Sequence, residues 1–484
     1  MDFITNLSIG FGVALTLSNL FYCFSGVLLG TLVGVLPGIG PVTTVAILLP
    51  FSFTLPPESA LIMLAGIYYG AQYGGSTTAI LVNIPGEASS VVTTIDGHKM
   101  ALAGRAGPAL GIAALGSFFA GCFATMLIVV AAPPLASIAL NFGPAEYFSL
   151  MVCGLVAAIV LAHGSIVKAL GMVVLGLMFG IAGTDINSGI RRFTFGFSGL
   201  ADIAVHLEKK DDGKAEVAKD IGNVWPSWAD IKFCIPAILR GTGLGSLLGV
   251  LPGGGALLAA FAAYTLEKKV AKKPRRFGQG DIRGVAAPES ANNAGAQTSF
   301  IPMLTLGIPS NPTMAMMIGA MMIHGISPGP RVMTERPGLF WGLIVSMWIG
   351  NLMLVILNLP LVGIWVKLLR IPYRLLYVSI VVFCCIGTYS VNGNVFDIYM
   401  MGFFAAFGYI CIKLECEPAP LILGFVLGPM MEENLRRSLL ISRGDFMVFL
   451  QEPISLGFLI AAVGLLLVVA MPAIRKTRDE AMQE

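Results

Sequence analysis

The chain has 484 residues, of which 56% are hydrophobic and 12% are charged, and its formal net charge is +3. Ordinary soluble proteins contain roughly 25% charged residues, so this composition excludes a separate soluble domain. Apolar stretches of roughly 20 residues, long enough to cross a bilayer as helices, recur along nearly the whole chain. The sequence therefore predicts a polytopic membrane protein made of α-helices.

Residues 1–200 are expected to form a first transmembrane repeat. Gly26, Gly30 and Gly34 are spaced by four, which places them on one helix face where another helix can approach closely. We expect the helix to break at the PGIG sequence that follows, because proline lacks a backbone donor and glycine permits unusual φ values. A polar stretch, YGAQYGGSTTAILVNIPG, begins at Tyr69. The candidate binding residues of this repeat are Pro37, Gly38, Gly40, Thr43, Gln72, Ser76, Thr77, Thr78 and Asn83.

Residues 201–232 are expected to form a polar linker, because they mix acidic and basic residues. Trp225 and Trp228 stand where the chain re-enters apolar sequence. Aromatic residues often mark a membrane interface in this way, although packing inside the protein explains them equally well.

Residues 233–445 are expected to form a second transmembrane repeat. Residues 245–255 (GSLLGVLPGGG) agree with residues 30–40 (GTLVGVLPGIG) at eight of eleven positions. Shared motifs follow in the same order, among them GAQ in both halves, and NIPG matched by GIPS. Such a colinear series indicates two structural repeats. Residues 446–484 then form one further helix and a basic tail.

The orientation of the two repeats is inferred from charge. Residues 51–59 contain no lysine or arginine, whereas the matching segment of the second half, residues 267–283, contains seven. Basic loops stay on the cytoplasmic side, so equivalent loops are expected on opposite sides of the membrane. The predicted fold is therefore an all-α polytopic membrane protein with two inverted repeats, Gly/Pro-broken re-entrant helices and about 10–13 transmembrane segments.

The second repeat also carries the more polar candidate site. Glu289, Asn293 and Gln297 are spaced by four and so share one helix face, just before a segment broken by prolines. Glu289 either binds a proton or cation or lies among lipid headgroups near Arg283. The candidate binding residues of this repeat are Pro252, Gly253, Gly255, Glu289, Asn292, Asn293, Gln297, Thr298, Ser299, Pro309, Ser310 and Asn311. Five other acids are expected in loops or at the interface, namely Glu58, Glu87, Glu146, Asp185 and Asp397.

Broken helices at matching places in two halves are typical of a transporter's binding region, because their free backbone groups need protein, water or ligand as partners. Neutral oxygens suit a dehydrated Na⁺, and amides and hydroxyls can also hold a carboxylate. We therefore predict a Na⁺ near Asn292, Asn293 and Thr298. The simpler alternatives are tight turns at a helix interface and hydrogen bonds between helices. The four histidines form no zinc or catalytic pattern, so no enzyme is predicted.

The paired glycine and proline motifs, with APESANNAGAQTSFIPMLTLGIPSNPT from Ala287 and GAMMIHGISPGP from Gly319, closely resemble the large membrane subunit of tripartite tricarboxylate transporters, the TctA family. The resemblance covers roughly residues 10–470. Carried onto this chain, the family's motifs fall on the glycine and proline positions given above and on Asn292 and Asn293. Ser310 stands where the family motif commonly has glycine.

The resemblance implies the permease subunit of a secondary transporter in the bacterial inner membrane. Such a permease uses no cofactor and is driven by a Na⁺ or H⁺ gradient. Its partners would be a small TctB-like membrane subunit and a periplasmic TctC-like solute-binding protein, and its substrates organic anions such as citrate. An elevator mechanism follows only as a hypothesis. The alternatives are a carboxylate symporter that needs no binding protein and, more distantly, a membrane-embedded enzyme or an assembly scaffold.

Overall fold

The computed structural model describes most of the chain. The described residues are 3–35, 40–83, 85–139, 142–161, 165–180, 183–184, 191–192, 223–251, 255–271, 276–368, 385, 389, 395–414, 416 and 418–470. Several predicted positions therefore lie outside them: Pro37, Gly38, Pro252 and Gly253, most of the 201–232 linker and the basic tail. The side chain of Thr43 also lies outside the described set.

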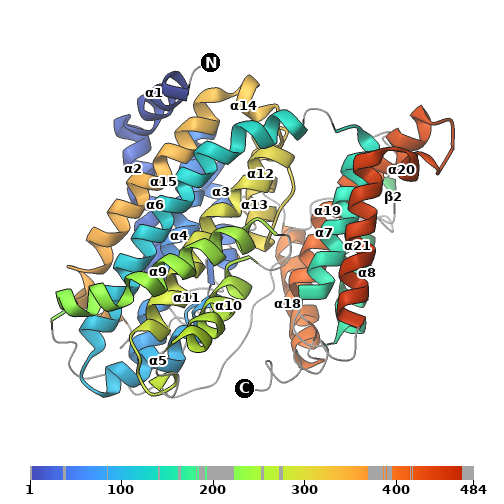
Figure 1. Cartoon of the computed structure of the whole chain (residues 1–484). Helices are drawn as coiled ribbons and strands as arrows, with labels where there is room; N and C mark the ends of the chain where they lie inside the picture. Colours follow the sequence, from blue (N-terminus) through green and yellow to red (C-terminus); the bar gives the residue numbers. More distant parts are fainter. Residues whose placement is uncertain are drawn as a thin grey trace.

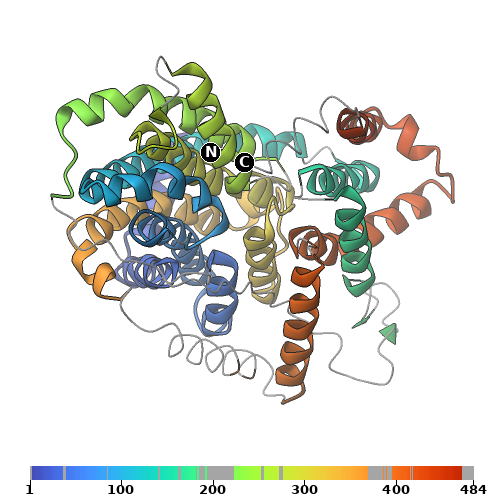
Figure 2. The same cartoon turned by 90° about the horizontal axis from the view of Figure 1, so that it is seen from below.

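The helices form two bundles that stand apart in both views (Figures 1 and 2). The larger bundle has its own extensive apolar core. Its helices are α1 (Phe3–Ala14), α2 (Leu17–Gly34), α3 (Gly40–Ser52), α4 (Pro57–Val82), η1 (Ala88–Ser90), α5 (Val91–Leu102), α6 (Ala106–Ala139), α9 (Trp228–Gly249), α10 (Gly255–Val270), α11 (Arg283–Thr298), α12 (Phe300–Leu306), α13 (Pro312–Ile323), α14 (Val332–Glu335), α15 (Pro337–Asn358) and α16 (Val362–Leu368).

The smaller bundle lies to the right in Figure 1. It comprises α7 (Pro144–Leu161), α8 (Ile166–Gly180), α18 (Val395–Lys413), α19 (Pro418–Ile441), α20 (Val448–Gln451) and α21 (Pro453–Ala470). A short antiparallel pair, β1 (Gly183–Thr184) with β2 (Arg191–Arg192), follows α8. Ile308 and Ala315, around the start of α13, pack into the apolar clusters of this bundle and so connect it to the larger one.

Four of the described helices, α2, α6, α9 and α15, are long and apolar enough to cross a membrane. Their outward faces carry large exposed apolar side chains such as Phe21, Leu239 and Ile356. Soluble proteins rarely expose large contiguous apolar patches, so these faces are typical of contact with lipid. The structure thus agrees with a polytopic, all-helical membrane protein, while the number of spans stays a prediction. Trp225 and Trp228 are exposed, which favours interfacial anchoring over internal packing.

The glycine stripes lie at the closest helix contacts in the larger bundle. A Cβ atom added at Gly30 would come within 3.0 Å of the carbonyl oxygen of Ile67 in α4. A Cβ at Gly245 would meet Ala291 in α11 in the same way. The other pairs are Gly26 with Met63, Gly34 with Ala71, Gly241 with Ala287 and Gly249 with Gly295. The predicted close approach is confirmed: α2 packs backbone to backbone on α4, and α9 does so on α11.

The predicted breaks are also confirmed by the helix ends. α2 ends at Gly34 and α3 begins at Gly40, while α9 ends at Gly249 and α10 begins at Gly255. The second break in each half has a left-handed residue after its helix: Asn83 (φ 57°) after α4, and Gly307 (φ 71°) after α12. Both residue types tolerate this conformation, which ends a helix by redirecting the chain. The first of these breaks leads into η1 and the second into α13.

Candidate functional site

The candidate site is built around α11, which packs against α9, α10, α6 and α5. All of its residues from Gly284 to Thr298 are buried. Its alanines, glycines and serine are small enough for several helices to approach at once. Because α11 is surrounded by other helices, its polar side chains lie in the interior, where each needs a hydrogen-bonding partner.

Glu289 lies in the interior, with 1% of its surface exposed. The hydroxyl of Ser76 in α4 donates to one of its carboxylate oxygens, and the hydroxyl of Thr93 in α5 donates to the other. Arg283 instead pairs with Asp281 at 2.8 Å. Glu289 therefore lies away from any headgroup position beside Arg283, and it joins three elements of the bundle.

Glu87 is a second buried carboxylate, 8% exposed, in the loop between α4 and η1. Its Oε1 accepts hydrogen bonds from Ser89 and from Nδ2 of Asn292, the latter at 2.8 Å. Ser89 also donates to Oε1 of Gln72 at 3.2 Å. The sequence predicts Glu87 in a loop or at the interface, and it does lie in a loop. That loop is buried, however, and its carboxylate meets α11.

Neither carboxylate has a basic partner in the part of the chain that the structure describes, where the ion pairs join other residues. Hydroxyl and amide groups are their hydrogen-bond donors. A buried carboxylate without a compensating positive charge is costly to keep ionised. The centre of the bundle therefore favours the uptake of positive charge, either a proton or a metal cation.

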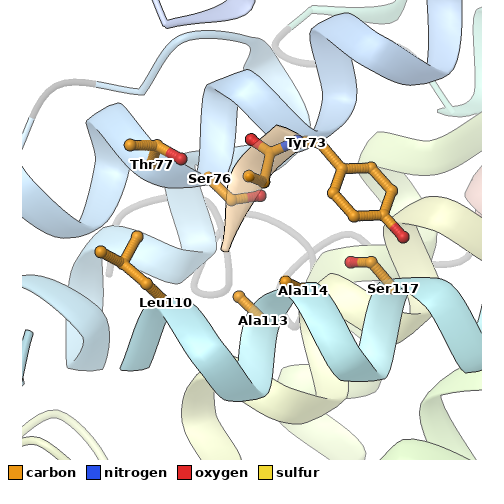
Figure 3. Close-up of a pocket in the computed structure, with 8 residues that line it drawn as sticks. Tyr73, Ser76, Thr77, Leu110, Ala113, Ala114 and Ser117 are labelled. Carbon is orange, nitrogen blue, oxygen red and sulfur yellow. The ribbon is translucent and has the colours of Figure 1, made fainter. Parts of the chain in front are cut away.

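Asn293 contacts α6. Its Nδ2 donates to the hydroxyl of Ser117 in α6 at 2.6 Å and to the backbone oxygen of Glu289 at 3.1 Å. Ser117 lines a small cavity between α4, α6 and the end of α15, with room for about one water-sized particle. Figure 3 shows side chains from α4 and α6 facing each other across it. The polar residues lining the cavity are Tyr73, Ser76, Thr77, Ser117 and Asn358.

The second break of the second half is held by Asn311. Its Oδ1 accepts from the backbone N–H of Met314 at 3.0 Å, which caps α13. Its Nδ2 donates to Ser299 at 3.1 Å and to the hydroxyl of Tyr68 in α4 at 3.3 Å. Ser310 donates to the backbone oxygen of Ser299 at 3.3 Å. One asparagine thus fixes both the turn and its position against the first half.

The structure buries many of the predicted residues in the larger bundle, but they contact different partners. Asn292 faces Glu87, Asn293 faces Ser117, and Thr298 donates to the carbonyl of Ala294 at 3.0 Å. The three side chains thus have different hydrogen-bond partners, and a Na⁺ bound by all three stays a prediction.

Three further predicted residues have distinct settings. Thr78 donates to the carbonyl of Val35 at 3.0 Å, at the first break. Asn83 is exposed. Gln297 is 1% exposed, and both of its polar side-chain atoms lack a partner among the described residues.

Sequence reasoning missed five residues of this network. They are Tyr68, Glu87, Ser89, Thr93 and Ser117. Glu87 directly follows the NIPG break, and this position was a usable signal. Thr93 and Ser117 gave none, because single hydroxyl residues are common in membrane helices.

Paired helix breaks around buried polar groups in a helical membrane protein are typical of transport proteins. The model of the tripartite tricarboxylate transporter TctA family matches residues 20–423. The chain therefore belongs to this family, and it is a transport protein rather than an enzyme.

Two relatives from Agrobacterium vitis show how far the similarity extends. An uncharacterized 52.8 kDa protein in the TAR-I ttuC' 3' region is 57% identical over 500 residues, covering 100% of this chain and 99% of the relative. A protein in the TAR-II ttuC' 3' region is 58% identical over 240 residues, covering 50% of this chain and 99% of the relative. No solved structure matches the chain significantly.

Proposed function

We propose that this chain is the large permease subunit of a binding-protein-dependent secondary transporter that imports a tricarboxylate or another organic anion, such as citrate, on a Na⁺ or H⁺ gradient. The observation that carries this proposal is the pair of buried carboxylates, Glu87 and Glu289, which have no basic partner among the described residues. A co-transported cation would offset their charge and part of the desolvation cost of an anionic substrate.

The substrate would be bound by the amides and hydroxyls around the two breaks. Gln297 supports this role, because a buried amide whose two polar atoms lack partners among the described residues can serve as donor and acceptor for a ligand. Asn311 and Ser299 lie at the adjacent break and offer further polar atoms. We propose that the candidate residues in both halves form one pathway at this place, with α3 and α10 directing their helix N-termini toward the anion.

We also propose that the chain consists of two inverted repeats, residues 1–200 and 233–445, joined by a linker at 201–232 and followed by a terminal helix at 446–484. Crosswise packing supports this division. α6 belongs to the first half yet packs on α11, and its counterpart α15 packs on α4. Likewise, α13 packs on α3 while η1 packs on α10. Repeats related by a two-fold axis in the membrane plane would exchange their elements in this way.

The separation of the two bundles supports an elevator mechanism, in which one bundle carries the substrate site past the other (Figure 1). The expected partners are a small TctB-like membrane subunit and a periplasmic TctC-like binding protein, and the expected location is the bacterial inner membrane. Family membership supports these assignments.

Uptake into proteoliposomes tests the proposal. The vesicles would contain this chain and its small partner, with Na⁺ and proton gradients imposed separately, with and without the cognate binding protein. We expect organic-anion uptake only with the binding protein and one of the two gradients. Uptake without the binding protein would make the chain a self-sufficient symporter. Failure of every organic anion under every gradient would overturn the proposal.

The Asn293→Ala variant tests the site within the same assay. Because Asn293 links Ser117 to the Glu289 backbone, its loss should lower uptake about tenfold and shift the cation dependence. The amount of protein in the membrane should stay unchanged. Wild-type uptake by a well-inserted Asn293→Ala protein would rule out this residue as part of the site.

A further inference from the structure

A cavity next to the candidate site has the chemistry of a cation site that the sequence motifs do not indicate. It lies between the middle of α4, the first half of α6 and the last turn of α15. Figure 3 shows the side chains that α4 and α6 contribute to its lining. We propose that it binds one Na⁺, held by oxygen atoms of Ser76, Ser117, Asn358 and Tyr73. The proposal rests on the proposed function and names the ion and its position.

Two of these side chains present oxygen atoms that nothing else uses. Asn358 donates its Nδ2 to the carbonyl of Leu354 at 2.9 Å, which leaves Oδ1 without a partner among the described residues. The hydroxyl oxygen of Tyr73 also lacks one. Their residues are 6% and 4% exposed. A buried, unpartnered polar atom is unfavourable unless a ligand supplies the missing interaction.

The two serines offer lone pairs rather than protons. The Ser76 hydroxyl has acceptors at Glu289 and at the carbonyl of Gln72, the latter at 3.2 Å. The Ser117 hydroxyl lies 3.4 Å from the backbone oxygen of Glu289 and accepts from Asn293. Each hydroxyl has a single proton, and that proton is used in a hydrogen bond to one of these acceptors. The lone pairs of the hydroxyl oxygens can therefore face the cavity.

This arrangement favours a cation over an anion. An anion needs several hydrogen-bond donors, and among the oxygens named above only the Tyr73 hydroxyl has a proton without a partner among the described residues. That hydroxyl can turn its proton away from the cavity and present a lone pair, as the Asn358 amide oxygen does. Glu289 supplies one negative charge directly behind Ser76. One carboxylate balances one monovalent cation, and a divalent ion would leave an uncompensated charge in the bundle. The size of the cavity suits a single dehydrated ion.

The site would couple the ion to the proposed substrate region. Ser117 accepts from Asn293, and Ser76 donates to Glu289, so an ion in the cavity would be linked to these two α11 residues through one serine each. The bound ion would connect oxygen atoms of α4, α6 and α15, and through the two serines it would also connect these helices to α11. Na⁺ is therefore expected to stabilise the arrangement of these helices that holds the polar centre, before any substrate binds.

Thermal unfolding of the purified chain tests this proposal without transport. We expect NaCl to raise Tm over choline chloride and KCl at equal ionic strength, in a saturable manner. Asn358→Ala should weaken the apparent Na⁺ affinity about tenfold or more. Tyr73→Phe should weaken it as well, and it keeps the ring that fills the core if Asn358→Ala proves unstable.

Asn351→Ala is a matched control. Asn351 lies on the same helix, donates to the carbonyl four residues earlier and also has an unpartnered Oδ1, but it does not line the cavity. Its Na⁺ response should equal that of the wild type. Absence of a Na⁺-specific Tm shift in the wild type, or equal weakening in both asparagine variants, would overturn the site.

The Tm measurements and the uptake assay together separate the two proposals. If the chain takes up an organic anion on a proton gradient and Na⁺ does not change its Tm, the proposed transport function stands and the Na⁺ site is overturned. A Na⁺-specific Tm shift, lost in Asn358→Ala, in a chain that takes up no anion under any gradient would keep the ion site and overturn the proposed function.

Discussion

The pair α2 and α4 and the pair α9 and α11 have the same backbone packing but different polar contents. In each pair, three glycines spaced by four lie against carbonyl oxygens of the neighbouring helix. α4 carries only neutral polar groups such as Gln72 and Ser76 in its buried middle, whereas α11 carries the carboxylate of Glu289. The first half supplies its carboxylate from the loop after α4, at Glu87. Close helix contact is thus duplicated, while charge is placed differently in the two halves.

The largest expected effect comes from breaking the shared packing. Gly30→Ala and Gly245→Ala should each destabilise the protein by about 3 kcal/mol, because the new Cβ atom would overlap a backbone oxygen that cannot move without its helix. Tm and the fraction of monodisperse protein in detergent would measure it. Gly243→Ala is the control on α9, since nothing lies within 4 Å of its Cβ position. A large loss in one half only would contradict equivalent packing.

The next-largest effect concerns Asp96, whose hydrogen bonds hold the loop that precedes α11. Asp96 of α5 is fully buried, and its Oδ1 accepts the backbone N–H groups of Gly278, Gly280 and Asp281 at 2.7 to 2.9 Å. Its Oδ2 accepts from the hydroxyl of Tyr264 at 2.9 Å. This carboxylate holds the loop that leads into α11. Asp96→Ala should cost about 2–3 kcal/mol, because charge-assisted bonds are lost and buried donors are left unpaired.

Tyr264→Phe removes only one of those bonds and should cost about 1 kcal/mol. Thermal unfolding of both variants tests the difference. Equal Tm values for Asp96→Ala and Tyr264→Phe would mean that the backbone bonds contribute little, and that α11 is held mainly by its glycine contacts.

A third test concerns the charge difference itself. Glu289→Gln should keep the fold, because an amide can still bond to Ser76 and Thr93, but it should lower uptake at least tenfold, about 1.4 kcal/mol, by removing the charge that a coupling cation compensates. Glu87→Gln should lower uptake as well. Glu146→Gln is a control with a buried acid in the smaller bundle. Uptake at the wild-type level by Glu289→Gln would show that this carboxylate does not take part in coupling.

Much of the fold could be predicted from local sequence, because its signals repeat along the chain. Glycine spacing gave the closest helix contacts, and proline with glycine gave the places where helices end. The polar face of α11 was visible as Glu289, Asn293 and Gln297 at a helical spacing. The separation into two bundles was not visible, since apolar helices carry little information about which neighbour each one chooses.

The contacts of the candidate site were harder to predict, because they join distant segments. Ser76 meets Glu289 across 213 positions, and Ser117 meets Asn293 across 176. A lone serine or threonine in an apolar helix has no distinguishing pattern, so Thr93 and Ser117 were missed. The loop position of Glu87 could be predicted, but no local pattern shows that this loop is buried. Only the inward course of that loop brings it to Asn292.

The smallest effect is expected at Asn83, which with Gly307 is one of the two left-handed residues that end α4 and α12. Asn83→Gly should change stability by no more than about 0.5 kcal/mol, because Asn83 is exposed and glycine adopts the same φ. Gly307→Asn should cost about 1–2 kcal/mol, because its Cβ would lie 2.8 Å from the carbonyl oxygen of Pro328. Tm of the two variants and of the double exchange measures this. Equal costs would show that backbone conformation alone decides the residue at both breaks, whereas the expected asymmetry arises because only the second break is pressed against another loop.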